Sequence, residues 1–172
     1  MWNDLHENKG IIVFLNLQGN DWFMVEIERK FLVNEEKWKR SKPENGVLIR
    51  QGYIFDTEKG ILRVRIKGTK GFLTIKSQTV SMTRTEFEYE IPVNEAEILL
   101  DNMCDSSLSK TRYSFKAGNH SWDIDEFHGR LAPLILAEIE LEDESEQFEL
   151  PDFVGEEVTF DKQYYNSELI KK

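Results

Sequence analysis

Charged side chains recur at every second position in several segments of this chain, and this spacing constrains the fold more than any other feature. In the first such segment, Glu26, Glu28 and Lys30 alternate with Ile27 and Arg29. Successive side chains of a β-strand point to opposite faces of a sheet, so alternate residues share one face. Pairs of like charge at this spacing follow along the chain: Arg63 and Arg65, Glu86 and Glu88, Lys110 and Arg112, Asp123 and Asp125, and Glu138 and Glu140. The pattern predicts a mainly β protein whose strands each carry a charged face.

The strand-like segments are short, and turn residues separate them. They cover Val25–Val33, Val47–Phe55, Ile61–Lys67, Phe72–Thr79, Arg84–Pro92, Leu108–Lys116, His120–Phe127 and Ile135–Glu142. Short helices are expected at 34–40, 94–103 and 164–170, the second with Asn94 as its N-cap. About eight strands at hairpin spacing predict an antiparallel sheet closed into a barrel, in a mainly β (α+β) fold with a few helices packed outside.

The charged faces have two interpretations. In a sandwich they would face water, which is the usual place for charge at this spacing. However, like charges on one face repel each other, and the opposite faces, such as Leu62, Val64 and Ile66, are apolar enough to need covering. A barrel with its charged face inward and its apolar face under helices satisfies both observations. The pattern alone leaves the two interpretations open.

The overall charge narrows the class of partner. Of the 172 residues, 32 are acidic and 22 are basic, which gives a formal net charge of −10. Non-specific binding to a nucleic-acid duplex or a membrane needs a basic surface, so we expect neither. A small anionic substrate remains compatible with this charge, because basic residues can gather in one place.

The cysteine content and the hydropathy indicate the compartment. The single cysteine, Cys104, rules out an intrachain disulfide and a zinc cluster, and we expect it to be a small packed residue. No stretch approaches the roughly 20 apolar residues that span a bilayer. We therefore expect a cytoplasmic protein, either a monomer or a homodimer.

The N-terminal residues read differently from the rest. Ile11–Leu17 is a short apolar run, but little positive charge precedes it and no small-residue cleavage site follows, so a secretory signal is not expected. Met24 stands directly before the first patterned segment. We expect residues 1–23 to be an extension and residues 24–172 to form one domain. The alternative is that the extension adds a strand or a covering segment.

Seven motifs occur in an order that resembles a known family. They are Glu26-Ile27-Glu28-Arg29-Lys30 (an E-x-E-x-K motif), Arg63-x-Arg65, Leu73-Thr74-Ile75-Lys76, Arg84-x-Glu86-x-Glu88, Lys110-x-Arg112, Trp122-Asp123-Ile124-Asp125, and Ala137-Glu138-Ile139-Glu140-Leu141. This series resembles the CYTH superfamily, the triphosphate tunnel metalloenzymes, and in particular its short bacterial inorganic triphosphatases. The resemblance implies an eight-stranded antiparallel barrel that forms a tunnel with a charged interior.

The resemblance also implies a role for each charged set. A triphosphate carries several negative charges, and arginine suits bidentate contact with phosphate. The implied phosphate-binding residues are Lys30, Arg63, Arg65, Lys76, Arg84, Lys110 and Arg112, with Lys162 next to Gln163, where relatives often carry arginine. The implied ligands for Mg²⁺ or Mn²⁺ are Glu26, Glu28, Asp125, Glu138 and Glu140, which suit hard cations. Glu26, Glu28 and Lys30 are the implied catalytic residues, and Glu86, Glu88 and Asp123 are further acidic candidates.

The implied activity is metal-dependent hydrolysis of a small anionic triphosphate, with inorganic tripolyphosphate cleaved to pyrophosphate and phosphate. Water would attack the terminal phosphoryl group in line, without a covalent intermediate. Three alternatives stay open: a class IV adenylate cyclase, a thiamine or nucleoside triphosphatase, and a non-enzymatic polyphosphate-binding module. The sequence shows no motif for reading a base, which favours the hydrolase.

Overall fold

A computed structural model describes residues 27–77, 86–143 and 145–172 of the chain. In these residues nine strands form one antiparallel sheet in the order β5-β4-β3-β2-β6-β7-β8-β1-β9. The strands are β1 (Ile27–Val33), β2 (Val47–Thr57), β3 (Gly60–Lys67), β4 (Lys70–Ser77), β5 (Glu86–Ile91), β6 (Ser107–Ala117), β7 (His120–Phe127), β8 (Ile135–Leu141) and β9 (Val154–Glu157). The helices are α1 (Glu35–Ser41), α2 (Val93–Asn102) and α3 (Asn166–Leu169), with 3₁₀ turns η1 (Gly129–Leu131) and η2 (Lys162–Tyr164).

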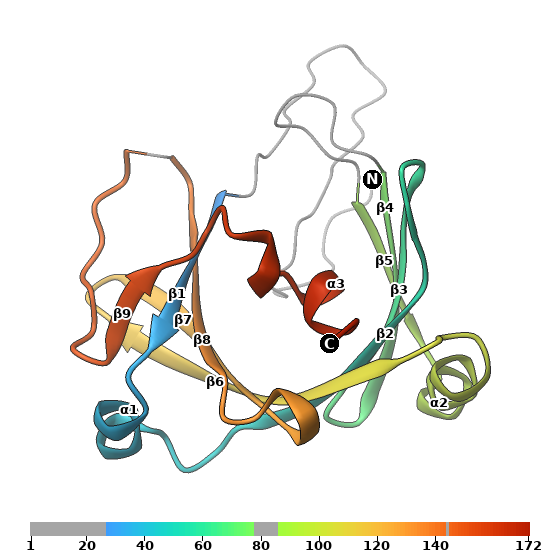
Figure 1. The fold of residues 1–172 in the computed structure, drawn as a ribbon, viewed down its shortest axis with the longest axis horizontal. Helices are drawn as coiled ribbons and strands as arrows, with labels where there is room; N and C mark the ends of the chain where they lie inside the picture. Colours follow the sequence, from blue (N-terminus) through green and yellow to red (C-terminus); the bar gives the residue numbers. More distant parts are fainter. Residues whose placement is uncertain (1–26, 78–85, 144) are drawn as a thin grey trace, which may run out of the picture.

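The sheet curves like the wall of a barrel (Figure 1). Helices α1 and α2 lie outside the curve, whereas α3 lies within it. The mainly β, antiparallel architecture with few helices is the predicted one, and it has one strand more than expected. Within the described residues the sheet ends at β5 and β9, which do not pair with each other.

The strand registers place the predicted charged faces on the inner side. Across β1 and β8, Lys30 lies opposite Glu138, and across β6 and β7, Arg112 lies opposite Asp125. Because directly opposed residues of antiparallel strands project from the same face, the charges of several strands converge. The interior of the curve is therefore lined by charged side chains, as the barrel interpretation predicted.

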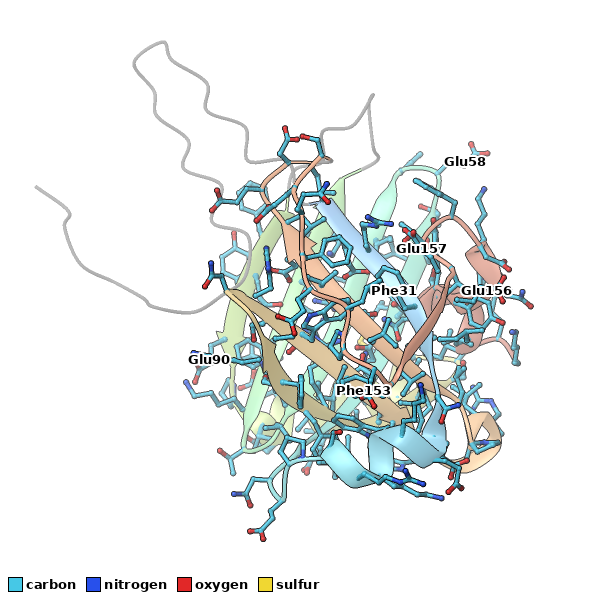
Figure 2. The ribbon with its side chains drawn as sticks, turned by 90° about the vertical axis from the view of Figure 1, so that its left-hand side faces the viewer. Phe31, Glu58, Glu90, Phe153, Glu156 and Glu157 are labelled. Atoms are coloured by element: carbon cyan, nitrogen blue, oxygen red, sulfur yellow. The ribbon has the colours of Figure 1, made fainter. Side chains whose placement is uncertain are left out.

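The opposite, outer face of β1, β6, β7 and β8 carries the largest apolar cluster. Trp38 of α1 is fully buried there and packs edge-on against Phe153, with ring centroids 4.9 Å apart. Figure 2 shows Phe31 of β1 and Phe153 on this side of the molecule, where both belong to the same buried cluster. Helix α1 begins after Asn34, whose side chain accepts a hydrogen bond from Lys37 N at 3.0 Å and so caps the helix.

Helix α2 covers the outer face of the other half of the sheet. Ala96 and Leu100 of this helix pack against Val64. Gly52 of β2 faces the same helix, and a Cβ atom there would lie 2.8 Å from Cys104 Sγ, so glycine permits the close approach. Cys104 is half-buried, and burial raises the pKa of its thiol, in keeping with the expected packing role. No helix in the described part of the chain is long and apolar enough to cross a membrane.

The C-terminal residues fill one part of the interior with apolar side chains. Leu169 and Ile170 pack against Leu108 of β6 and Leu136 of β8. Arg130 holds this segment by donating a 2.6 Å hydrogen bond to the carbonyl oxygen of Ile170. The segment therefore lies against the inner face of the sheet as part of its packing.

Candidate active site

The inner face of β1 and β8 holds a lysine between two carboxylates. Lys30 Nζ lies 2.8 Å from Glu138 Oε1 and 3.0 Å from Glu28 Oε1. Lys30 and Glu138 are each 6% exposed, whereas the side chain of Glu28 is 40% exposed. Lys30 thus joins a buried carboxylate to one that water can reach.

Arg112 of β6 links this group to β7. Its Nε and NH2 atoms lie 2.7 and 2.6 Å from the two carboxylate oxygens of Asp125, a two-contact arrangement. NH2 also lies 2.7 Å from Glu138 Oε2, and NH1 lies 2.9 Å from Asp123 Oδ2. Lys110 makes a further, short ion pair with Asp125, which is fully buried. The cations on this side of the interior are therefore paired with carboxylates.

Strand β3 carries cations that are paired much less completely. Arg63 NH2 lies 3.0 Å from Thr74 Oγ1 and 3.3 Å from Glu88 Oε2, while the Thr74 hydroxyl donates to Glu88 at 2.8 Å. The Nε atoms of Arg63 and Arg65 are shielded from water and have no hydrogen-bond partner in the described structure. Because a shielded donor without an acceptor is costly, this side of the interior favours an anionic ligand.

The pKa shifts reflect this difference between the fully paired cations and the incompletely paired arginines of β3. Burial alone would raise the pKa of Glu138, but the charges of Lys30 and Arg112 outweigh it and hold that pKa well below its usual value. Glu28 is open to water on one side, but its partial burial, together with the neighbouring charge of Glu138, raises its pKa. Burial, with the charges of Arg63 and Arg112, lowers the pKa of Arg65 to about 9. Since a guanidinium remains protonated in practice, we take this lowering as the cost of an incompletely paired cation.

The other predicted site residues have different surroundings. Lys76 is half-buried on β4, and Glu140 is exposed on β8; each has an interaction partner. Lys162 is exposed on η2, and Asn166 of α3 approaches Lys110 Nζ at 3.5 Å. Three predictions lie outside the described atoms: Glu26, Arg84 and the side chain of Glu86.

Three neutral residues of the interior were not among the predicted site residues. Gln51 and Thr74 are buried, and Tyr53 is half-buried. Their place follows from the registers, since Gln51 is opposite Arg65, and Tyr53 and Thr74 flank Arg63. The only signal in the sequence was that they alternate in phase with the charged positions. A neutral residue at such a position does not by itself indicate a binding role.

The side of the interior that carries Glu28, Asp125 and Glu138, here called the acidic side, offers carboxylate oxygens, which suit a hard divalent cation. The charge of Glu138 contributes to the raised pKa of Glu28 even though Lys30 contacts both carboxylates, so a further cation beside Glu28 would be favourable. No group of three or more His, Cys, Asp or Glu side chains among the described residues is arranged to hold a metal ion. The described residues therefore fit part of such a site, and Glu26 lies just before them in the chain.

Comparison with known proteins places the chain in a family. The inorganic triphosphatase of Acetivibrio thermocellus is 45% identical over 147 residues, covering 85% of this chain and 93% of that protein. The inorganic triphosphatase of Nitrosomonas europaea is 40% identical over 153 residues, covering 85% and 97%. A crystal structure of an inorganic triphosphatase matches with a TM-score of 0.64 at 38% identity, over 86% of this chain and 95% of that one. The CYTH domain family matches residues 24–171, and the chain belongs to that family.

Proposed function

We propose that this protein hydrolyses inorganic tripolyphosphate to pyrophosphate and phosphate with the help of Mg²⁺ or Mn²⁺. The names of its relatives and the charge arrangement of the interior support the same activity. We place residues 24–172 in one catalytic domain and residues 1–23 in an extension. A cytoplasmic location, and the choice between monomer and homodimer, stay predictions.

The observation that carries the proposal is the contrast between the two sides of the interior. Lys30, Lys110 and Arg112 are held by carboxylates, whereas the Nε atoms of Arg63 and Arg65 have no partner among the described residues. A phosphate chain would supply the missing acceptors, and arginine binds phosphate oxygens through two N–H groups at once. We therefore assign Arg63 and Arg65 as primary phosphate contacts, assisted by Lys76 and Arg84.

The residues of the acidic side would position the reacting end of the phosphate chain. Glu28 and Glu138, with Glu26 and Glu140, would hold the divalent cation, which neutralises phosphate charge and polarises the phosphoryl group under attack. Lys30 would stabilise charge on the phosphate while its ion pairs offset the repulsion between Glu28 and Glu138. Asp125 is fully buried, and Arg112 and Lys110 make three contacts to its two oxygens, so we assign it the orientation of those two cations. Glu138 also binds two cations, but it lies beside Glu28, which water can reach.

Substrate preference tests the proposal. The protein should be incubated with Mg²⁺ or Mn²⁺ and tripolyphosphate, ATP, thiamine triphosphate or pyrophosphate, with phosphate, pyrophosphate and cyclic AMP measured separately. We expect tripolyphosphate to have the highest kcat/KM, because the described site offers contacts for a phosphate chain and the sequence shows no motif for reading a base. Pyrophosphate should react poorly, since it would lose the remote contacts that assist the transition state.

Glu28→Gln provides the matched control, because it keeps the side-chain shape and removes one carboxylate of the acidic side. Its loss of turnover would show that the phosphate released comes from this protein. Cyclic AMP and pyrophosphate as the main products from ATP would instead assign the protein to the cyclases. Higher kcat/KM for ATP than for tripolyphosphate would show that the nucleoside is recognised.

A further inference from the structure

Gln51 and Tyr53 share the inner face of β2 and border the two incompletely paired arginines. In the β2–β3 ladder Gln51 is directly opposite Arg65, and Tyr53 is directly opposite Arg63. Gly52 between them faces outward against Cys104 and Leu100. The backbone therefore presents an amide and a phenol to the same space as the two guanidinium groups.

The hydrogen bonds of this pair are incomplete. Gln51 is 1% exposed, and its Nε2 lies 3.4 Å from the Tyr53 hydroxyl, whereas its Oε1 has no partner among the described residues. The oxygen and nitrogen of an amide can exchange places with little change in shape. In the present orientation the Tyr53 O–H remains free to donate; in the exchanged one Tyr53 donates to Gln51 and the amide N–H groups are free. Either arrangement leaves an uncharged donor beside Arg63 and Arg65.

We propose that Gln51 and Tyr53 bind a phosphate oxygen of the substrate with uncharged hydrogen-bond donors, next to the arginines. This inference rests on the proposed function, because it names two further contacts for the same phosphate chain. A phosphate oxygen accepts several hydrogen bonds at once, so it can take the arginine Nε donors together with the donor of this pair. Burial also raises the pKa of Tyr53 despite its arginine neighbours, so the phenol keeps its proton.

The position of Tyr53 indicates what these donors add. Its ring packs against the apolar cluster of Leu108, Leu169 and Ile170. A neutral donor can therefore fix the phosphate at the border of the apolar cluster without adding to the repulsion between the arginines. Its contribution to affinity should persist at high salt, where the attraction between exposed charges is screened.

Direct binding measurements test the contact without depending on turnover. Tripolyphosphate is titrated by calorimetry in excess chelator into the full chain and into Tyr53→Phe and Gln51→Met, at low and high salt. We expect each variant to bind on the order of ten-fold more weakly, the usual effect of losing a hydrogen bond to a charged group. The fold-change should be the same at both salt concentrations, whereas the loss caused by Arg63→Gln should shrink as salt rises.

Tyr113→Phe is the matched control, because Tyr113 is a buried tyrosine that packs against Trp38 in the outer cluster. It should bind tripolyphosphate like the unmodified protein. Unchanged affinity in both Tyr53→Phe and Gln51→Met would overturn the inference, even if the protein cleaves tripolyphosphate. Weakened, salt-independent binding would uphold the contact even if the protein proved unable to cleave tripolyphosphate. An unmodified protein that binds no tripolyphosphate would contradict both proposals.

Discussion

Lys30 Nζ lies 2.8 Å from Glu138 Oε1 across the β1–β8 ladder, and both side chains are 7% exposed. Glu138 uses its second oxygen to bind Arg112 at 2.7 Å, so one buried carboxylate joins two cations from different strands. Breaking a buried pair leaves the partner charge without compensation, which costs more than the pair itself contributes. Glu138 should therefore matter for stability as well as for activity. Glu140, two residues later on the same strand, is exposed and should matter for activity alone.

Glu138→Gln should reduce the free energy of unfolding by about 3–5 kcal/mol, because Lys30 and Arg112 would each lose a buried counter-charge. Glu140→Gln should change it by less than about 1 kcal/mol, since exposed charges contribute little to stability. Urea unfolding of both variants measures the difference. Equal stability of the two variants would contradict the role assigned to Glu138. Both are expected to lose turnover.

The ionisation of Glu28 should be visible in the pH dependence of stability. The pKa of Glu28 is raised in the folded protein, so in the window from about 4.5 up to that raised value the folded state keeps a proton that the unfolded state releases. Stability conferred by this group therefore declines as the pH rises through that window. In excess chelator, Glu28→Gln should show a flatter profile there. Parallel profiles of the two proteins would refute the assignment.

The strand faces could be predicted from the sequence because they depend on local alternation. Glu28 and Lys30 were placed on one face by phase alone, and the β1–β8 ladder confirms that they face the same carboxylate-bearing strand. Which charged residues pair with each other, and which stay exposed, could not be predicted from the sequence. Asp125 and Glu140 were grouped as metal ligands, yet Asp125 is buried between cations and Glu140 is exposed. Such differences arise from pairing between strands distant in sequence.

Short elements were harder to predict for a related reason. No strand was expected at β9 (Val154–Glu157), which follows a turn closed by a 2.9 Å hydrogen bond from Val154 N to the carbonyl oxygen of Pro151 and pairs with β1 through an irregular register. Its four residues are too few to show an alternation, and only the partner strand defines them. Helix α2 was expected to have Asn94 as its cap, but it begins at Val93 with Pro92 at the N-cap and no side-chain cap. Proline suits the start of a helix because its missing N–H has no role there.

Removal of divalent cations should abolish turnover of tripolyphosphate, and Mg²⁺ or Mn²⁺ should restore it. Carboxylates such as Glu28 and Glu138 provide the oxygen ligands that these ions prefer. Binding should also be visible without turnover, as a rise in Tm when Mg²⁺ is added to the chelated protein. Glu28→Gln should reduce that rise. Full activity in excess chelator would rule out a metal-assisted reaction.

Arg65→Met should separate the binding of phosphate from the stability of the fold. The pKa of Arg65 is lowered to about 9 by burial and by Arg63 and Arg112, which means that its charge is poorly compensated before an anion binds. Replacing it with an apolar side chain of similar length removes that cost, so the ligand-free protein should gain on the order of 1 kcal/mol of stability.

The same substitution should weaken the binding of tripolyphosphate about ten-fold or more, because it removes a charge-assisted contact to phosphate. Thermal unfolding with and without tripolyphosphate measures both effects in one experiment. Arg130→Met is the matched control, because Arg130 holds the C-terminal carbonyl of Ile170 and touches none of the ion pairs of the site. It should lower Tm slightly and leave the shift caused by tripolyphosphate unchanged. If Arg65→Met instead lowered the Tm of the ligand-free protein, Arg65 would be a cation that stabilises the fold, and its assignment as an incompletely paired phosphate contact would be wrong.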